Sequence, residues 1–204
     1  MHQLLNGEQY NFEFCALVFV IKVSDLIFRF MEFIRQKAKR IKLLLLDVDG
    51  VLTDGRIIYD NKGRDLKVFD VHDGLAIFLL RRMGIPTILI SARGSATIHR
   101  RAKDMNVFKV IENAQPKSKA FLKILMALKL RPAQVCFVGD DLVDLGIAQR
   151  AGLAVAVKNA CPEIKECAHY ITKKMGGRGA VREVAELILK CQGKWDKAVE
   201  SYIE

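Results

Sequence analysis

The chain is poor in the cysteine patterns that build disulfide frameworks and zinc sites. Its 204 residues include five cysteines, an odd number, and no two of them form a C-x-x-C pair. One of the five, Cys136, lies in an apolar run typical of a buried strand. A disulfide scaffold or a zinc site is therefore not expected, and the composition favours a reducing compartment. We predict a cytoplasmic protein.

The sequence also lacks an apolar run long enough to span a bilayer. The run at 14–21 is too short, and charged residues interrupt its surroundings at Glu13, Lys22, Asp25 and Arg29. No positively charged segment precedes this run and no small-residue cleavage site is evident, so a signal peptide is not indicated. We predict no stable membrane insertion. Residues 1–34 are predicted to be an N-terminal leader, of which residues 1–30 are dispensable or mis-assigned, with Met31 as an alternative start.

Acidic residues are outnumbered by basic ones, 23 against 33, and the formal net charge is +10. Such a charge suits a nucleic acid, an acidic membrane surface or a phosphorylated metabolite as partner, and equally a basic surface that is merely solvated. The densest basic run, at 35–42, contains no interleaved aromatic residues that could stack on bases. We therefore predict no nucleic-acid partner.

Short apolar runs alternate with amphipathic stretches from Ile41 onward. The apolar runs occupy 41–46, 86–90, 107–111, 135–138 and 153–157, and the helix-like stretches occupy 74–83, 95–105, 117–128, 142–151 and 180–191. Strands that are apolar on both faces and separated by helices predict a parallel sheet with helices on both faces. No internal repeat, low-complexity tract or second domain is apparent. We therefore predict an α/β fold.

One segment, 56–69, breaks this alternation. It contains the turn sequence Asp60-Asn-Lys-Gly63 between residues of high strand propensity, which predicts a small β-hairpin inserted after the first strand. The predicted domain runs from 35 to 193 and includes this hairpin, and residues 194–204 form a predicted C-terminal tail.

Four of the predicted strands are each followed by residues that can bind a metal ion or a phosphate. The residues are Asp47 and Asp49, then Ser91 and Arg93, then Lys117, and finally Asp140 with Asp141. In an open parallel sheet, ligands bind outside the carboxyl ends of the strands. We therefore expect these side chains to form one site.

The carboxylates of this set predict magnesium chemistry. Asp47 and Asp49 are two residues apart and repel each other unless a cation or a shared proton lies between them. With Asp140 and Asp141 they offer hard oxygen ligands, which Mg²⁺ prefers, whereas no histidine or cysteine group that would suit zinc accompanies them. A lone Asp-x-Asp is more often a turn or a helix cap; the Gly-Asp-Asp at a second strand end favours the metal.

The same residues suit phosphoryl transfer through a covalent intermediate. A carboxylate nucleophile divides ester hydrolysis into two steps, and a second carboxyl can protonate the leaving oxygen and then deprotonate water. Asp47 fits the first role and Asp49 the second. Ser91 can donate a hydrogen bond to phosphate, and Lys117 supplies positive charge, although Lys119 on the same predicted helix competes with it for this role.

With these residues in place, the chain resembles the haloacid dehalogenase superfamily. The segment Asp47-Val-Asp-Gly-Val-Leu-Thr53 is similar to its first motif, Ser91 to its second, Lys117 to its third and Gly139-Asp-Asp-Leu-Val-Asp144 to its fourth. Within the superfamily, the chain resembles the 3-deoxy-D-manno-octulosonate 8-phosphate phosphatase family, which acts in making the Kdo sugar of lipopolysaccharide. That resemblance rests on Thr53-Asp-Gly55, the hairpin, Phe69-Asp-Val-His-Asp-Gly74 and Gly176-Gly-Arg-Gly-Ala-Val-Arg-Glu183.

The resemblance implies a Rossmann-like fold without a large cap domain and a homotetramer in which the hairpins pair centrally. It implies catalysis by Asp47, Asp49, Ser91 and Lys117, with Mg²⁺ held by Asp47, the backbone carbonyl of Asp49, and Asp140. It also implies contacts to a small phosphorylated sugar acid from Asp49, Asp70, Val71, His72, Asp73, Gly74, Phe78, Arg93, Arg101 and Lys117. The C-terminal tail and Arg178 are expected near a neighbouring subunit's site.

The chain departs from the family pattern in three segments. The family usually has Asn-Val-Arg-Asp-Gly where this chain has Asp70-Val-His-Asp-Gly74, Thr-Gly-Arg where it has Ser91-Ala-Arg93, and often an arginine at Phe78. Ser91 retains the hydroxyl group of the threonine that it replaces. The other differences replace cationic contacts to an acidic sugar with weaker or apolar ones. His72 is either a substrate contact or a polar residue satisfied within its loop.

Three alternatives to this function stay open. One is a phosphatase for another small phosphorylated sugar. Another is a catalytically silent oligomerisation domain related to those appended to nonulosonate cytidylyltransferases, which the complete set of catalytic residues argues against. The last is a phospho-acceptor receiver domain, in which neither the Asp-x-Asp-Gly arrangement nor the hairpin has a role.

Overall fold

The structure, a computed structural model, describes residues 25–200, 202 and 203. Two units divide the chain, 1–36 and Lys37–Glu204, and the second contains every predicted site residue. Most of the predicted leader lies outside the described residues, so its role stays a prediction; the part from 25 to 34 is helical. Among the described residues, no helix is both long enough and apolar enough to cross a membrane.

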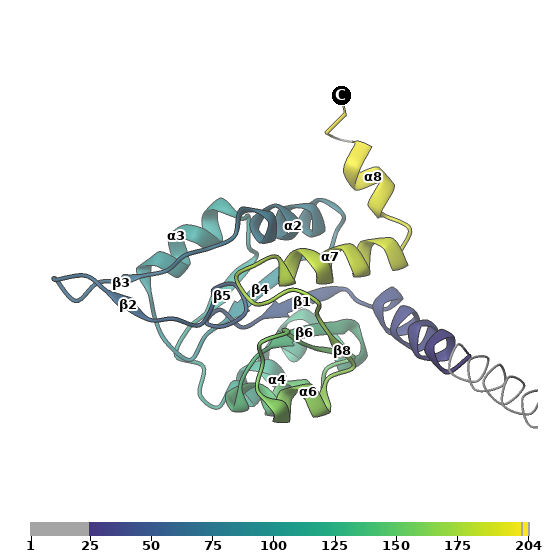
Figure 1. Cartoon of the computed structure of the whole chain (residues 1–204), viewed down its shortest axis with the longest axis horizontal. Helices are drawn as coiled ribbons and strands as arrows, with labels where there is room; N and C mark the ends of the chain where they lie inside the picture. Colours follow the sequence, from purple (N-terminus) through teal and green to yellow (C-terminus); the bar gives the residue numbers. More distant parts are fainter. Residues whose placement is uncertain (1–24, 201, 204) are drawn as a thin grey trace, which may run out of the picture. The chain divides into compact units, whose positions relative to one another are not determined.

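A six-stranded parallel sheet forms the centre of the second unit, as predicted (Figure 1). Its strand order is β5-β4-β1-β6-β7-β8. The strands are β1 (Leu43–Leu46), β4 (Thr87–Ile90), β5 (Lys109–Ile111), β6 (Val135–Gly139), β7 (Leu153–Ala156) and β8 (Tyr170–Ile171). All four leucines of β1 are fully buried, because helices cover both faces of the central strands.

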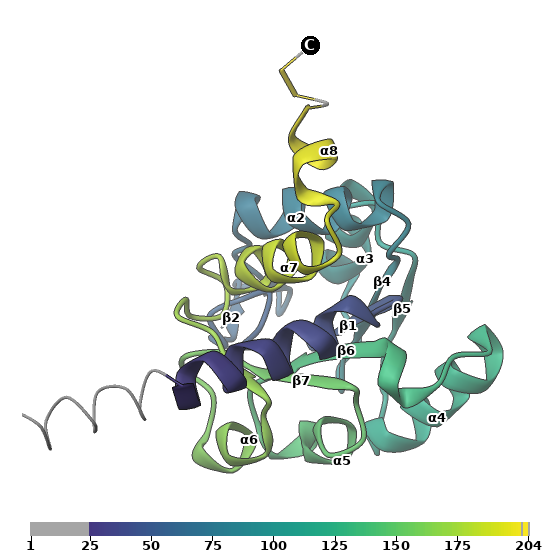
Figure 2. The same ribbon diagram turned by 90° about the vertical axis from the view of Figure 1, so that its right-hand side faces the viewer.

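Helices cover the sheet in two layers. The helices of the second unit are α2 (Val71–Arg82), α3 (Ala96–Asp104), α4 (Lys117–Leu128), α5 (Leu145–Ala148), α6 (Pro162–Cys167), α7 (Ala180–Cys191) and α8 (Trp195–Glu200), with 3-10 turns at Pro132–Gln134 and Leu142–Asp144. Figures 1 and 2 show α2, α3 and α7 on one face and α4, α5 and α6 on the other. The α/β, Rossmann-like architecture predicted from the sequence is thus confirmed.

The largest differences between the predicted and the observed element boundaries concern two helices. Helix α2 begins at Val71, three residues before the predicted start, because the Asp70 side chain caps it by accepting a hydrogen bond from the His72 backbone N–H. The helix predicted at 142–151 is instead a 3-10 turn followed by the four-residue α5. Strand β8 and helices α6 and α8, all short, were not predicted.

The segment inserted after β1 is a separate two-stranded sheet. Strand β2 (Ile58–Tyr59) pairs antiparallel with β3 (Asp65–Leu66), and the hairpin extends away from the main sheet (Figure 1). Its turn is closed by the Asp60 carboxylate, which accepts hydrogen bonds from the backbone N–H groups of Lys62 and Arg64. The described residues contain no larger insertion between these elements, so the carboxyl edge of the sheet is uncapped within one chain.

Candidate active site

A cavity of about 300 Å³ lies at the carboxyl ends of the central strands. The predicted residues that line it are Asp47, Asp49, Ser91, Arg93, Lys117, Asp140 and Asp141, joined by Gln115 and Val143 among others. They come from β1, β4, β6 and the start of α4. The parallel sheet therefore brings together residues that are up to 94 positions apart (47 to 141) in the sequence, as the strand-end argument predicted.

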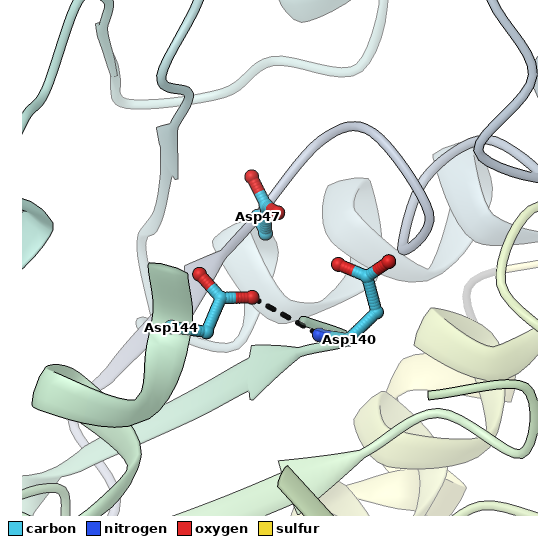
Figure 3. A group of neighbouring side chains, drawn as sticks. All are labelled: Asp47, Asp140 and Asp144. Carbon is cyan, nitrogen blue, oxygen red and sulfur yellow. Dashed lines mark hydrogen bonds between the residues drawn. The ribbon is translucent and has the colours of Figure 1, made fainter. Parts of the chain in front are cut away.

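The ammonium group of Lys117 is shared between two buried carboxylates. Its Nζ lies 2.7 Å from Asp47 Oδ1 and 2.7 Å from Asp144 Oδ1. The other Asp144 oxygen accepts a hydrogen bond of 3.0 Å from the Asp140 backbone N–H (Figure 3). Asp144 therefore fixes both the lysine and the end of β6. Lys119, the competing lysine, does not line the cavity.

Burial dominates the electrostatics of this group. Desolvation raises the pKa of Asp47 well above its ordinary value, and the nearby Asp144 carboxylate raises it further against the opposing effect of Lys117. Desolvation, with a contribution from Asp144, also raises the pKa of Asp140 to about 6. Burial acts to lower the pKa of Lys117, but Asp47 and Asp144 outweigh it and raise that pKa. Several buried carboxylates thus lie close together, and a bound cation would relieve the repulsion between them.

Three carboxylates are close enough to hold a cation between them. One oxygen from each of Asp47, Asp140 and Asp144 lies within 4.8 Å of the others (Figure 3). Asp140 Oδ1 is buried and has no hydrogen-bond partner, whereas both oxygens of Asp144 are bonded to protein groups. Hard oxygen donors of this kind suit Mg²⁺. Among these three carboxylates, the buried oxygen without a partner is therefore on Asp140, whereas Asp144 is occupied by Lys117 and the Asp140 backbone N–H.

The loop after β1 depends on glycines in two segments. Gly50 has φ +89, and a Cβ there would overlap the Asp140 carboxylate. Gly176 packs against the same loop, where a Cβ would overlap the Gly50 carbonyl oxygen. Side chains at either position would displace the loop or its neighbour. The glycine-arginine string singled out in the sequence thus helps to shape the site.

Ser91 and Arg93 lie at the end of β4. Ser91 is buried, and its Oγ accepts a hydrogen bond of 3.1 Å from the Arg93 backbone N–H. The hydroxyl hydrogen is consequently free to point toward a ligand in the cavity. Asp49, in turn, lies 2.6 Å through its Oδ1 from the Nζ of Lys67, which follows β3 in the hairpin segment.

Seven of the predicted substrate contacts lie outside the lining of this cavity in the single chain. They are Asp70, Val71, His72, Asp73, Gly74, Phe78 and Arg101. His72 is exposed and its Nδ1 lies 2.9 Å from Asp70 Oδ1. Arg101 donates to the Asp70 carbonyl and its guanidinium lies against Gly74. Their predicted contact with substrate stays a prediction.

Asp73 has a structural role in the single chain. Its buried carboxylate accepts hydrogen bonds from the backbone N–H groups of Gly179 and Arg182, at the start of α7. Desolvation nevertheless raises the pKa of Asp73 to about 6. This residue ties α2 to α7 across more than 100 positions of sequence (73 to 179).

Two residues of the site were not among the sequence predictions. In the sequence, Asp144 was recognised only as the last residue of the fourth motif; it ends the 3-10 turn after β6, four positions beyond Asp140, and that spacing could have placed it beside the strand end. Lys67 carries no such local pattern. It reaches Asp49 only because the hairpin folds back toward the loop after β1.

A larger cavity, of about 720 Å³, lies at the opposite edge of the sheet. Its lining includes Lys39, Arg40, Lys42, Arg131 and Lys194, and contains no carboxylate. Among the described residues, the carboxylates close enough together to hold a metal ion are Asp47, Asp140 and Asp144, and the first two of these line the smaller cavity. Size alone therefore does not locate the chemistry of this protein.

Comparison with known proteins shows which sequences this chain is similar to. A family model described as haloacid dehalogenase-like hydrolase matches residues 86–184. The chain is 40% identical over 163 residues to a 3-deoxy-D-manno-octulosonate 8-phosphate phosphatase of Yersinia pestis, covering 80% of this chain and 87% of that protein. It is 41% identical over 162 residues to the enzyme of that name from Shigella flexneri, covering 79% and 86%.

Solved structures agree in fold and sequence. The crystal structure of a 3-deoxy-D-manno-octulosonate 8-phosphate phosphatase from Moraxella catarrhalis, in complex with magnesium, phosphate and KDO, superposes with a TM-score of 0.81. It is 41% identical to this chain, and the match covers 83% of this chain and 97% of that one.

Proposed function

Since the chain belongs to the 3-deoxy-D-manno-octulosonate 8-phosphate phosphatase family of haloacid dehalogenase-like hydrolases, we propose that it hydrolyses a sugar-acid phosphate monoester. The favoured substrate is 3-deoxy-D-manno-octulosonate 8-phosphate, which yields Kdo and phosphate for lipopolysaccharide biosynthesis. One observation carries the proposal: Asp47, Asp49, Ser91, Lys117 and Asp140 line a single cavity. This complete set also argues against a catalytically silent oligomerisation domain.

The first step transfers the phosphoryl group to the protein. The Asp47 carboxylate attacks phosphorus, the bond from phosphorus to the ester oxygen breaks, and Asp49 gives its proton to the leaving oxygen. Ser91 donates a hydrogen bond to a phosphate oxygen, and Lys117 offsets the negative charge that gathers around Asp47. The product of this step is an aspartyl-phosphate and the free sugar acid.

The second step regenerates Asp47. Asp49 takes a proton from a water molecule, whose oxygen attacks phosphorus, and the bond between phosphorus and Asp47 breaks. Inorganic phosphate is released, and Asp49 is again protonated for the next cycle. Both steps use residues that the structure brings to one cavity.

The cofactor in this proposal is Mg²⁺, held by the carboxylates of Asp47 and Asp140 and the backbone carbonyl of Asp49. The unpaired, buried Asp140 Oδ1 supports this assignment, since buried carboxylate oxygens require a partner. When bound, magnesium neutralises the carboxylates and the phosphoryl group. Asp144 and Lys117 keep the ligands in place.

We assign recognition of the sugar acid to Arg93, which lines the cavity, and to the start of α2. Arg93 lines the cavity and offers a guanidinium group to a carboxylate. The remaining contacts, from the 70–74 segment, Phe78 and Arg101, require that segment to face an active site. In the proposed homotetramer that site belongs to a neighbouring subunit.

A second candidate function is hydrolysis of a different small sugar phosphate. Related enzymes usually have asparagine at the position of Asp70 and arginine at the position of His72, and often have arginine at the position of Phe78. This chain therefore has fewer cationic side chains with which to bind an acidic sugar. The catalytic residues are unaffected by these differences.

The test is magnesium-dependent phosphate release from 3-deoxy-D-manno-octulosonate 8-phosphate and from a panel of generic sugar phosphates. We expect a clear preference for the former and a loss of at least about 10³-fold in kcat for Asp47→Asn. The exposed Asp104→Asn serves as the matched control and should keep wild-type turnover. Equal turnover of all sugar phosphates would overturn the substrate, and an active Asp47→Asn would overturn the mechanism.

The proposed setting is a cytoplasmic homotetramer assembled through the hairpins. Its support is the hairpin itself, which leaves Ile58, Tyr59 and Leu66 exposed within one chain. Apolar side chains gathered on a small two-stranded sheet favour burial against other copies.

A further inference from the structure

A buried lysine from the hairpin segment contacts the proposed acid–base residue. The Nζ of Lys67 lies 2.6 Å from Asp49 Oδ1, and the lysine side chain is 7% exposed. Asp49 lines the catalytic cavity, whereas Lys67 does not. The ammonium group therefore contacts the Asp49 carboxylate from outside the set of residues that line the cavity.

A chain of polar contacts holds Lys67 in this position. Asp65 Oδ2 lies 3.6 Å from the Lys67 Nζ and accepts a hydrogen bond of 2.7 Å from Ser95 Oγ. Thr97, in the first turn of α3, donates to the Asp65 carbonyl. The contacts run from the start of α3, through β3, to the loop after β1. Lys67 thus has two acidic partners: Asp65, which is itself held by contacts to α3, and Asp49, to which the lysine makes its shorter contact.

The alternative interpretation is that Lys67 has only a structural role and anchors the hairpin. An anchor within the hairpin would need only Asp65, two residues away, but the lysine lies about 1 Å closer to Asp49, 18 positions away in sequence. Exposed ion pairs contribute little, whereas a buried ammonium group is retained only where partners compensate its lost hydration. The geometry therefore favours a role that depends on Asp49.

We propose that Lys67 is a positioning residue that holds Oδ1 of Asp49 so that the second carboxylate oxygen faces the leaving oxygen of the substrate. This inference rests on the proposed function, because it concerns the step in which the Asp49 proton passes to that oxygen. An alkoxide leaving group needs the proton as the bond to phosphorus breaks. The phenolate released from p-nitrophenyl phosphate is stable without one. Loss of positioning should consequently slow the hydrolysis of alkyl esters and leave the hydrolysis of this aryl ester nearly unchanged.

The test compares Lys67→Met with wild type on the best sugar phosphate and on p-nitrophenyl phosphate, with saturating Mg²⁺. We expect kcat/KM for the sugar phosphate to fall by about 10- to 100-fold, a part of the usual contribution of general acid catalysis, and kcat/KM for the aryl ester to fall less than about 3-fold. Lys67→Arg should recover most of the loss. Lys62→Met, on the turn of the same hairpin, is the matched control and should behave as wild type on both substrates.

A double-mutant cycle with Asp49→Asn separates positioning from folding. If Lys67 acts through Asp49, Lys67→Met adds no further loss on the sugar phosphate in the Asp49→Asn background. Asp65→Asn, which weakens the support of Lys67, should give a smaller loss with the same selectivity for the alkyl ester, and it keeps the proposal testable if Lys67→Met does not fold.

Equal losses on both esters, or losses that multiply in the double mutant, would overturn the positioning role. A wild-type protein that hydrolyses neither ester would instead overturn the proposed function. The two failures are therefore distinguishable.

Discussion

At the scale of single residues, Lys117 and Asp144 show how the site carries more negative charge than it can neutralise by itself. Asp47 and Asp144 share one ammonium group, and the Asp140 carboxylate lies close to both of them. Asp144 helps by fixing Lys117 and the Asp140 backbone, and it also raises the pKa of Asp47 and Asp140 after the larger effect of burial. Its net effect on stability should therefore depend on a bound cation.

We expect Asp144→Asn to lower the free energy of unfolding by about 1–3 kcal/mol in saturating Mg²⁺, because a buried lysine loses one of its two partners. In EDTA the loss should shrink, since the substitution also removes a repulsive charge. Urea denaturation in both conditions measures this. Asp104→Asn, in an exposed pair 3.8 Å from Arg100, is the control and should change stability by less than about 0.5 kcal/mol. An Asp144→Asn loss that is the same with and without Mg²⁺ would contradict the account.

At the scale of elements, α2 and α7 pack against each other and share the Asp73 carboxylate. Asp73 belongs to α2, yet it bonds the first backbone N–H groups of α7, which have no partner within their own helix. The glycines that precede α7 reach the loop after β1 in the same stretch of chain. This contact therefore connects the stability of the helix pair to the shape of the active site.

Burial of the Asp73 carboxyl group predicts a pH dependence of stability. Burial raises the folded-state pKa from 3.8 to about 6, so the stabilising contribution is full below pH 4 and is lost as the pH rises through 6. Between pH 5 and 7.5 we expect wild type to lose about 1–2 kcal/mol relative to Asp73→Asn, which cannot ionise. Denaturant unfolding of both proteins at several pH values measures the difference. A difference that does not change with pH would count against a raised pKa at Asp73.

At the scale of the whole molecule, the hairpin presents an apolar surface that the single chain leaves exposed. Ile58 and Leu66 are paired across the two strands and are 39% and 51% exposed. A two-stranded sheet with such a face is marginal by itself in water and gains stability when it packs on another copy.

We therefore expect light scattering at micromolar concentration to report a tetramer, and Ile58→Asp with Leu66→Asp to shift it to smaller species. Leu122→Asp, at a residue of α4 that is 50% exposed, is the control and should leave the assembly intact. Aspartate at these two positions should disrupt the assembly, because burying an unpaired charge in an interface between subunits is costly. A wild-type monomer would contradict the proposed assembly.

The sequence by itself determined the sheet and the edge at which the chemistry lies. Runs such as Leu43–Leu46 are apolar at every position, which is compatible only with burial on both faces, and helical stretches between them require parallel strands. Because parallel strands end at one edge, Asp47, Ser91 and Asp140 could be placed together without coordinates. Motif resemblance then supplied roles for them.

Tertiary structure alone decided which side chains support those residues. Lys67 meets Asp49 only after the hairpin folds back, and Asp73 meets Gly179 only after α2 packs against α7. Neither contact follows from strand or helix periodicity, since that periodicity gives the face a residue occupies and not its distant neighbour. The edge of the sheet was thus set by local patterns, whereas the contact that Asp49 makes with Lys67 and the attachment of α7 were set by long-range packing.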